Sequence, residues 1–172
     1  DTISFIAEGN DGSFILDAAA SPEECRRAVS SADLIFCLDC NSFARTGPLE
    51  DAMRSSSARK VLIDHHLAPD SGAFDLVFST PEVSSACELL YNVLLALPDV
   101  SRLPQPSAEA LMAGMTTDTN NFSNSVYPST FAMASGLLGA GVDRDGILLK
   151  LFNEYRENRL RIMGWLLYQN MR

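Results

Sequence analysis

The chain has 172 residues, 47% of them hydrophobic, with a formal net charge of −9 and an isoelectric point near 4.6. The hydrophobic content excludes a disordered chain, and the length suffices for one domain with a sizeable core. The acidic charge argues against a wide basic surface for long duplex nucleic acid. It does not exclude a small phosphorylated substrate, because a bound divalent metal can supply positive charge locally.

No uninterrupted apolar run approaches the ~20 residues of a membrane helix, and no signal peptide is evident. We therefore expect a cytoplasmic protein with no membrane partner. Cys37 and Cys40 form a C-x-x-C pair, which raises a redox or zinc interpretation. Only one such pair exists, and it lies at a strand end. We interpret these two residues, with Cys25 and Cys87, as free thiols in a reducing cytosol.

Helices and buried strands alternate in the first half of the chain. The sequence Ser-Pro-Glu-Glu from Ser21 is a strong helix start, and 49–56 is a second helical stretch. Three apolar runs predict buried strands, at 34–38, 61–64 and 74–78. Strand–helix–strand connections are right-handed and make the strands parallel. The sequence therefore predicts an α/β fold, a three-layer, mostly parallel sheet flanked by helices.

The second half is predicted to be helical. Ser85-x-x-Glu88 is a capping box, in which each side chain bonds to the other residue's backbone N–H, and it starts a helix that ends near Leu97. The polar stretch 116–125 is either a site element or a solvated turn on local grounds. Four more helices are predicted, at about 107–115, 129–138, 143–155 and from 156 onward.

Two of the predicted strands end in a carboxylate. Asp39 follows the first, and Asp64 ends the second, directly before His65 and His66, the only histidines in the chain. The carboxyl ends of parallel strands meet at one edge of the sheet, where ligands bind in open α/β folds. Adjacent side chains of a strand point to opposite faces, so the two histidines are expected to have different roles if the strand continues through them. Two titrating histidines in a surface turn are the alternative.

Asp39, His65 and Asp118 carry oxygen and nitrogen donors at the ends of three separate elements. Mixed carboxylate and imidazole ligation suits manganese, iron or cobalt better than calcium. A carboxylate such as Asp39 can bridge two metals, and a two-metal site activates water for phosphoryl displacement. Each aspartate alone could instead cap a loop or end a helix. The three together favour a metal site.

The ordered motifs resemble those of the DHH phosphoesterase superfamily. They are Leu38-Asp39, Asp64-His65-His66, 84–91, 114–119 with Phe122, 139–143 and 151–152. The resemblance runs from about Leu34 to Leu167. It is closest to the bacterial oligoribonuclease and 3′-phosphoadenosine-5′-phosphate phosphatase type, also described as exopolyphosphatase-related.

This resemblance implies a role for each polar side chain at the strand ends. Asp39 would bridge two manganese ions, with magnesium or cobalt as alternatives, and His65 and Asp118 would also bind metal. His66 would meet the phosphate or assist proton transfer. Asp64 would anchor an imidazole. The implied function is two-metal hydrolysis of short oligonucleotides or nucleotide phosphates, with a homodimer left open.

Arg45 is a weaker candidate for a phosphate contact, and a solvated loop arginine is the simpler interpretation. The family's first metal motif and its carboxyl-terminal substrate domain are absent from this sequence. We therefore expect an N-terminally incomplete DHH-type catalytic domain at 1–155 and a helix at 156–172 that leads to a missing second domain. With half of the family's ligands, this chain alone is expected to bind manganese weakly and to be inactive.

Three rival hypotheses remain open from the sequence. An inorganic pyrophosphatase or exopolyphosphatase of the same superfamily would share the catalytic motifs. A non-catalytic binding module could keep the fold and lose the metal. A doubly wound nucleotide-cofactor domain is disfavoured, because no glycine-rich fingerprint follows a strand.

Overall fold

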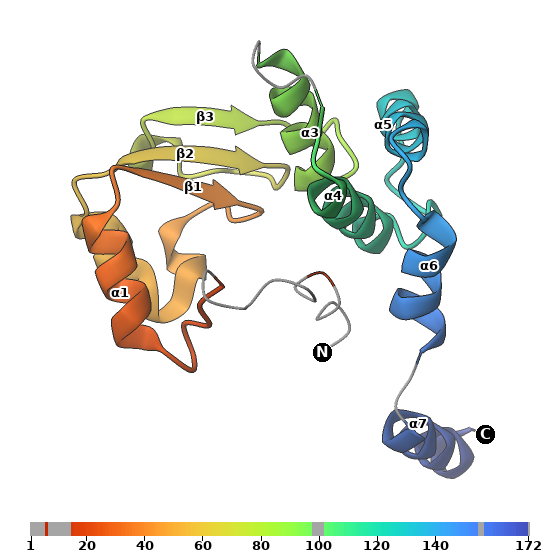
Figure 1. Ribbon diagram of the computed structural model, residues 1–172. Helices are drawn as coiled ribbons and strands as arrows, with labels where there is room; N and C mark the ends of the chain where they lie inside the picture. The colour runs from red at the N-terminus through yellow and green to blue at the C-terminus, as the bar shows by residue number, and fades with distance from the viewer. Residues whose placement is uncertain (1–5, 7–14, 98–101, 155–156, 172) are drawn as a thin grey trace.

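The computed structural model describes residues 6, 15–97, 102–154 and 157–171. Three strands, β1 (Leu34–Leu38), β2 (Arg59–Asp64) and β3 (Leu76–Ser79), form one parallel sheet in the order β1-β2-β3 (Figure 1). The predicted α/β class, with a parallel sheet flanked by helices, is confirmed. All three predicted strands form, with small shifts at their ends.

Helices α1 (Pro22–Ser31) and α2 (Glu50–Ser55) cover one face of the sheet, the lower face in Figure 1. Proline at the first position and two glutamates in the first turn favour the start of α1, although Ser21 makes no capping hydrogen bond. The short 3₁₀ helix η2 (Phe43–Leu49) leads from β1 into α2. The buried side chains on this side are Cys37, Phe43, Met53, Leu62 and Phe74.

The opposite face of the sheet is apolar and exposed at its two edge strands. Strand side chains alternate between faces, and the outward ones are 36% to 56% exposed. They are Leu34, Phe36 and Leu38 of β1 and Leu76 and Phe78 of β3. Parallel sheets are normally covered on both faces. The described residues supply a helical layer over one face and leave the edge strands of the other exposed, whereas Val61 and Ile63 of the central strand are buried on that same face.

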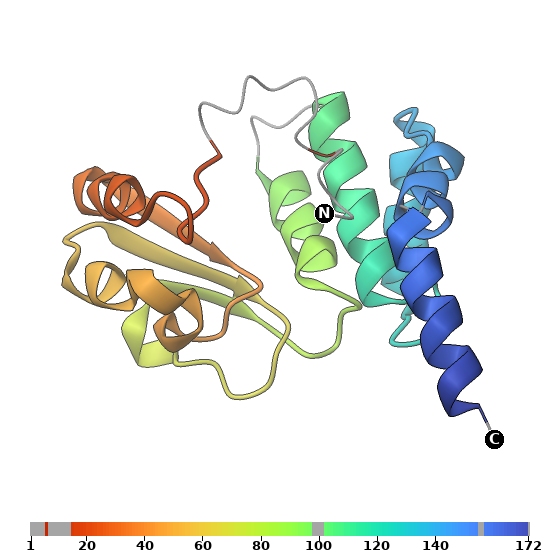
Figure 2. The ribbon, with the colours of Figure 1, turned by 90° about the horizontal axis from the view of Figure 1, so that it is seen from below.

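A second core lies among helices next to the carboxyl edge of the sheet (Figure 2). Its helices are α3 (Ala86–Ala96), α4 (Gln105–Asp118), α5 (Pro128–Gly139) and α6 (Arg144–Leu148). Gly114 permits the close packing of α4 on α3, because a Cβ there would lie 2.3 Å from Sγ of Cys87. This packing fixes the end of α4 relative to the sheet.

The helix predicted at 143–155 is divided. After α6 the chain continues as the π-helical turn η4 (Leu149–Asn153). Helix α7 (Glu157–Asn170) follows, and its side chains are exposed along its length. The division into 1–155 and 156–172 stays a prediction. Among the described residues, no helix is both long and apolar enough to span a membrane.

Candidate metal centre

The site begins where two parallel strands end. In the register of the sheet, Leu38 pairs with Ile63, so Asp39 lies beside the last residue of β2, Asp64. The backbone N–H of Asp39 donates to the carbonyl of Ile63 at 3.1 Å, and its φ is +58°. This left-handed conformation is costly for a residue with a side chain, and such strain is found at functional sites. It turns Asp39 at the end of β1.

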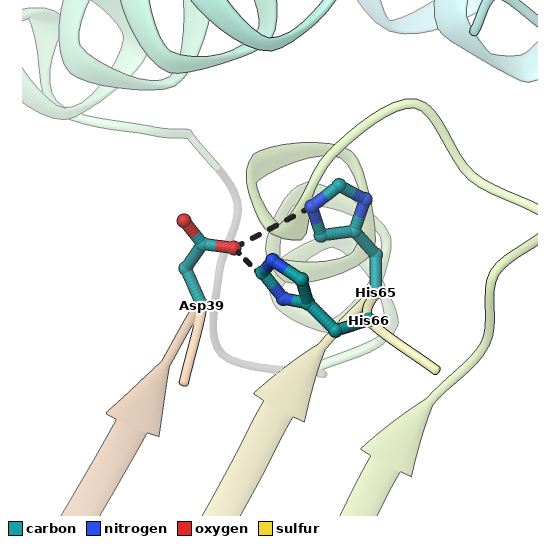
Figure 3. Close-up of side chains that lie close together, drawn as sticks. All are labelled: Asp39, His65 and His66. Carbon is teal, nitrogen blue, oxygen red and sulfur yellow. Dashed lines mark ion pairs between the residues drawn. The ribbon is translucent and has the colours of Figure 1, made fainter. Parts of the chain in front are cut away.

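His65 lies between two carboxylates from different parts of the chain. Its Nε2 is 3.4 Å from Oδ1 of Asp39 and 3.8 Å from Oδ2 of Asp118, the last residue of α4. The close-up in Figure 3 shows both imidazoles directed toward Asp39. The structure therefore brings together the three side chains for which a metal role is predicted, although they lie 26 and 53 residues apart (39 to 65, and 65 to 118). Their roles as ligands remain a prediction.

His66 is held by the carboxylate that precedes the pair. Nδ1 of His66 is 2.8 Å from Oδ1 of Asp64, and the backbone N–H of His66 donates to Oδ2 at 2.9 Å. Asp64 is fully buried. A carboxylate only accepts hydrogen bonds, so Nδ1 of His66 carries the proton and Nε2 keeps its lone pair. Asp64 thus fixes both the orientation and the tautomer of this ring.

The cluster is short of positive charge. Burial raises the pKa of the Asp118 carboxyl, and the nearby charge of Asp39 raises it further, while His65 and His66 offset part of the rise. Among the ion pairs of the described residues, the groups that face Asp39 and Asp118 are the two histidines. No lysine or arginine is among them. A cation bound here would relieve the repulsion between the two carboxylates.

The donor atoms fit a metal ion. One ligand atom from each of Asp39, His65 and His66 lies within 4.8 Å of the other two. Asp39 is 52% exposed and His65 is 23% exposed, so an ion can reach them from solvent. Mixed oxygen and nitrogen donors suit a transition metal such as manganese. The structure adds His66 to the candidate ligands, whereas the family resemblance implies a role toward the phosphate for that residue.

Arg45 does not join this cluster. It lies exposed in η2, and among the described residues no hydrogen bond or ion pair links its guanidinium to the carboxylates. Its phosphate contact stays a prediction. The four cysteines are free thiols, as expected. Cys87 lies close to the site, and burial, together with the charges of Asp118 and Asp39, raises its pKa to about 12, which keeps it a thiol.

A second polar cluster lies beside the first, around Glu88 in the first turn of α3. Oε2 of Glu88 accepts hydrogen bonds from the backbone N–H and hydroxyl of Ser84 and from the hydroxyl of Thr130. Burial would raise the pKa of Glu88, but interactions with Ser129, Ser84 and Thr130 outweigh it and lower the pKa. Oε1 itself has no partner in hydrogen-bond geometry among the described residues. Glu88 joins α3, its preceding loop and α5.

Two features of this region differ from the sequence predictions. Only half of the predicted capping box forms, because Ser85 accepts from the N–H of Glu88 while the Glu88 carboxylate bonds to Ser84 instead. The turn after α4 holds three successive residues with positive φ, Asn120, Asn121 and Phe122. Asparagine favours this conformation and phenylalanine does not, so the Asn-Asn pair was the one signal for it in the sequence.

Comparison with known proteins identifies the family of this chain. Residues 4–115 match the family described as "DHH family, N-terminal domain". The chain belongs to the DHH family. The matched region of this DHH chain includes Asp39, Asp64 and both histidines but ends before Asp118. The case for Asp118 therefore rests on its 3.8 Å approach to His65.

Similar proteins come from several bacteria. The chain is 30% identical over 125 residues to "Cyclic-di-AMP phosphodiesterase GdpP" of Bacillus subtilis, and 25% identical over 131 residues to "Cyclic-di-AMP phosphodiesterase PdeA" of Listeria monocytogenes. These alignments cover 72% and 75% of the chain but only 19% and 20% of those proteins. The chain thus spans about a fifth of the length of these relatives.

A solved structure matches nearly the whole chain. It is the crystal structure of an exopolyphosphatase-related protein from Bacteroides fragilis, 35% identical, with a TM-score of 0.87. The match covers 97% of this chain and 49% of that one. The likeness supports the DHH fold over the described strands and helices.

Proposed function

We propose that this chain is part of a metal-dependent phosphoesterase that hydrolyses short oligonucleotides or nucleotide phosphates. The observation that carries the proposal is the approach of Asp39, His65 and Asp118 at the carboxyl edge of the sheet. Membership of the DHH family supports the reaction class. Ligand binding at this edge is the general rule for open α/β sheets.

Asp39, His65 and Asp118 would hold the metal, and Asp39 is proposed as the ligand shared by two ions. Manganese is the proposed ion, with magnesium or cobalt as alternatives. When bound, such ions lower the pKa of water and stabilise charge on phosphoryl oxygens. The chain's own contribution is to fix these side chains. The sheet register sets Asp39 beside Asp64, and the packing of α4 on α3 brings Asp118 to His65.

His66 is proposed to meet the phosphate or to move a proton. Its Nδ1 proton is held by Asp64, so the free nitrogen, Nε2, accepts a proton or a hydrogen bond from the substrate. Asp64 is the positioning residue for this ring, because it is buried and contacts the ring and the backbone N–H of His66. The expected opposite directions of the two histidines are not found, because β2 ends at Asp64 and both rings face Asp39. The proposed difference between them rests instead on the contact of His66 with Asp64.

The substrate class is inferred from the relatives. GdpP and PdeA are named as phosphodiesterases of a cyclic dinucleotide, which supports a phosphodiester between nucleosides as substrate. A pyrophosphatase or exopolyphosphatase is the second candidate, favoured by the name of the Bacteroides fragilis neighbour. A non-catalytic module that keeps the fold is the third. The proposed location is the cytoplasm.

The test is a comparison of substrates and variants in the full-length gene product. It should hydrolyse a dinucleotide or 3′-phosphoadenosine-5′-phosphate with added manganese, and prefer them to pyrophosphate and polyphosphate. Asp39→Ala should abolish turnover, whereas Asp51→Ala on the exposed surface of α2 should not. A preference for pyrophosphate would select the second candidate. Equal turnover by the Asp39→Ala and wild-type proteins would refute the proposed site.

We further expect the 172-residue chain alone to bind manganese weakly and to turn over little substrate. Three proposed protein ligands shared by two ions leave each ion with few fixed donors. Activation of water requires both ions in a fixed geometry. Comparable turnover by this chain and the full-length gene product would show that the missing ligands lie elsewhere in this sequence.

A further inference from the structure

A cavity of about 370 Å³ lies beyond the end of α4, between the turn that follows it and the π-helical turn η4. Three of its lining residues come from the turn and three from α6 and η4. They are Asn120, Asn121, Ser123, Leu148, Phe152 and Asn153. The volume is within the range of small-molecule sites. Three amides and one aromatic ring form an unusual lining for a solvated turn.

Both walls of this cavity have uncommon backbone conformations. Asn120, Asn121 and Phe122 have φ of +47°, +55° and +64°. The facing wall is π-helical at Leu149–Asn153. Left-handed non-glycine residues and π-helical turns each cost stability and are found preferentially at functional sites. Here the two features border the same cavity.

The turn is bonded to the helix that carries the proposed metal ligand. The N–H of Asn121 donates to the carbonyl of Thr116 at 2.8 Å, and the N–H of Phe122 donates to the hydroxyl of Thr119 at 3.0 Å. Asn121 is three residues beyond Asp118, so their Cα atoms are at most about 11 Å apart. A single nucleotide can span this separation.

The orientation of one amide is fixed by a neighbour outside the cavity lining. Nη2 of Arg144 donates to Oδ1 of Asn121 at 2.6 Å, and the same guanidinium lies 5.5 Å from the ring centre of Phe122. Because Oδ1 is occupied, the Nδ2 hydrogens of Asn121 are left to donate. Among the described residues, the side chains of Asn120 and Asn153 have no hydrogen-bond partner. The cavity thus presents unused amide groups together with the aromatic ring of Phe152.

We infer that this cavity is a nucleobase subsite, which rests on the proposed function and extends it to the recognition of the base. Amide side chains pair with the donor and acceptor edge of a base, adenine above all. An aromatic ring stacks on the face of a base. The cavity lining contains no charged side chain, which suits a neutral base better than a phosphate. The phosphate of the same nucleotide would then extend toward Asp118.

Adenosine is the probe, because it carries the base and lacks the phosphate. Titrated into the ¹⁵N-labelled chain without metal, it should shift the signals of Asn120, Asn121 and Asn153 saturably, whereas ribose should not. Asn121→Asp keeps the partner of Arg144 and removes the two donors, so it should weaken adenosine binding about tenfold. Phe152→Leu should weaken it by a similar factor.

Asn124→Ala is the matched control, because Asn124 belongs to the same turn but does not line the cavity. It should bind adenosine as the wild-type chain does. Absence of saturable shifts, equal shifts with ribose, or wild-type affinity in both Asn121→Asp and Phe152→Leu would overturn the inference. Since no phosphate or metal takes part, such a failure leaves the proposed hydrolysis standing. Conversely, a failed hydrolysis assay with intact adenosine binding would refute only the proposed reaction.

Discussion

Two polar clusters lie close together at the carboxyl edge of the sheet and differ in how their charges are balanced. Around Glu88, hydroxyl and N–H donors of the same chain bond to one oxygen, Oε2, of a fully buried carboxylate. Around His65, the carboxylates of Asp39 and Asp118 lie on either side of an imidazole, and their like charges repel each other. The first cluster is stabilised by its own donors, and the second gains from a cation.

The pKa directions express the same contrast. Hydrogen bonds lower the pKa of Glu88 despite its burial, whereas burial and a neighbouring carboxylate raise the pKa of Asp118. A group with a lowered pKa stabilises the folded chain in its charged form, and a carboxyl with a raised pKa destabilises it when charged. A structural role for the first cluster and a ligand-binding role for the second explain this difference.

The largest effect is expected for Glu88→Ala. It removes three hydrogen bonds to a charged group and leaves the donors of Ser84 and Thr130 buried without a partner. We expect a loss of about 3 kcal/mol in the free energy of unfolding, measured with urea. Glu82→Ala, on the exposed loop before α3, should change it by less than about 0.5 kcal/mol. Similar losses for both variants would remove the distinction between the clusters.

A smaller effect, on metal affinity, is expected for Asp64→Asn. The amide introduced at position 64 would donate an N–H to Nδ1 of His66. Nδ1 would then act as the acceptor, and the ring proton would lie on Nε2. The ¹⁵N shifts of the imidazole report this change of tautomer. Loss of such a supporting contact should weaken manganese binding by about 10- to 100-fold. Asp70→Asn, at an exposed loop position, is the matched control, and an unchanged tautomer in Asp64→Asn would contradict the assignment.

Acid should destabilise the chain through Glu88. Its pKa is lowered in the folded state, so its contribution is present above the ordinary value of 4.5 and is lost as the pH falls through the lowered value. Glu88→Gln removes this titration. The difference in unfolding free energy between wild type and Glu88→Gln should therefore shrink as the pH is lowered below 4.5. A difference independent of pH would show that folding does not lower the pKa of Glu88.

The smallest effect, and one of opposite sign, is expected for Asp118→Asn without metal. The raised pKa means that ionisation of Asp118 costs stability as the pH rises above its ordinary value of 3.8. Removing the charge should therefore stabilise the chain at pH 7, by about 0.5 kcal/mol because the side chain is partly exposed. The gain should vanish in acid. Destabilisation of Asp118→Asn at pH 7 would show that the charged Asp118, like Glu88, stabilises the folded chain.

The sequence was sufficient to predict that Asp39 and His65 lie close together. Buried apolar runs that end in Asp39 and in Asp64-His65 predict parallel strands, and parallel strands bring their carboxyl ends together. The same reasoning does not predict side-chain contacts between segments that are distant in the sequence. The bond from Thr130 to Glu88 spans 42 residues, and local capping rules instead directed Glu88 to Ser85.

Local sequence rules also did not predict the backbone conformation of two segments. No local sequence signal predicts the π-helical turn at Leu149–Asn153 or the left-handed conformation of Phe122. Likewise, the apolar pattern of β1 and β3 predicts a sheet buried on both faces. Which face the described helices cover depends on how the whole chain packs.

Binding of manganese to this chain tests the central claim most directly. Free Mn²⁺ is followed by electron paramagnetic resonance as the 172-residue chain, Asp39→Asn, His65→Gln and the exposed-surface control Asp51→Asn are added. We predict weak, saturable binding by the wild type and by Asp51→Asn, and at least about tenfold weaker binding by the two site variants. Binding that is unchanged by Asp39→Asn and His65→Gln, or no saturable binding by the wild type, would contradict a metal site at the carboxyl edge of the sheet.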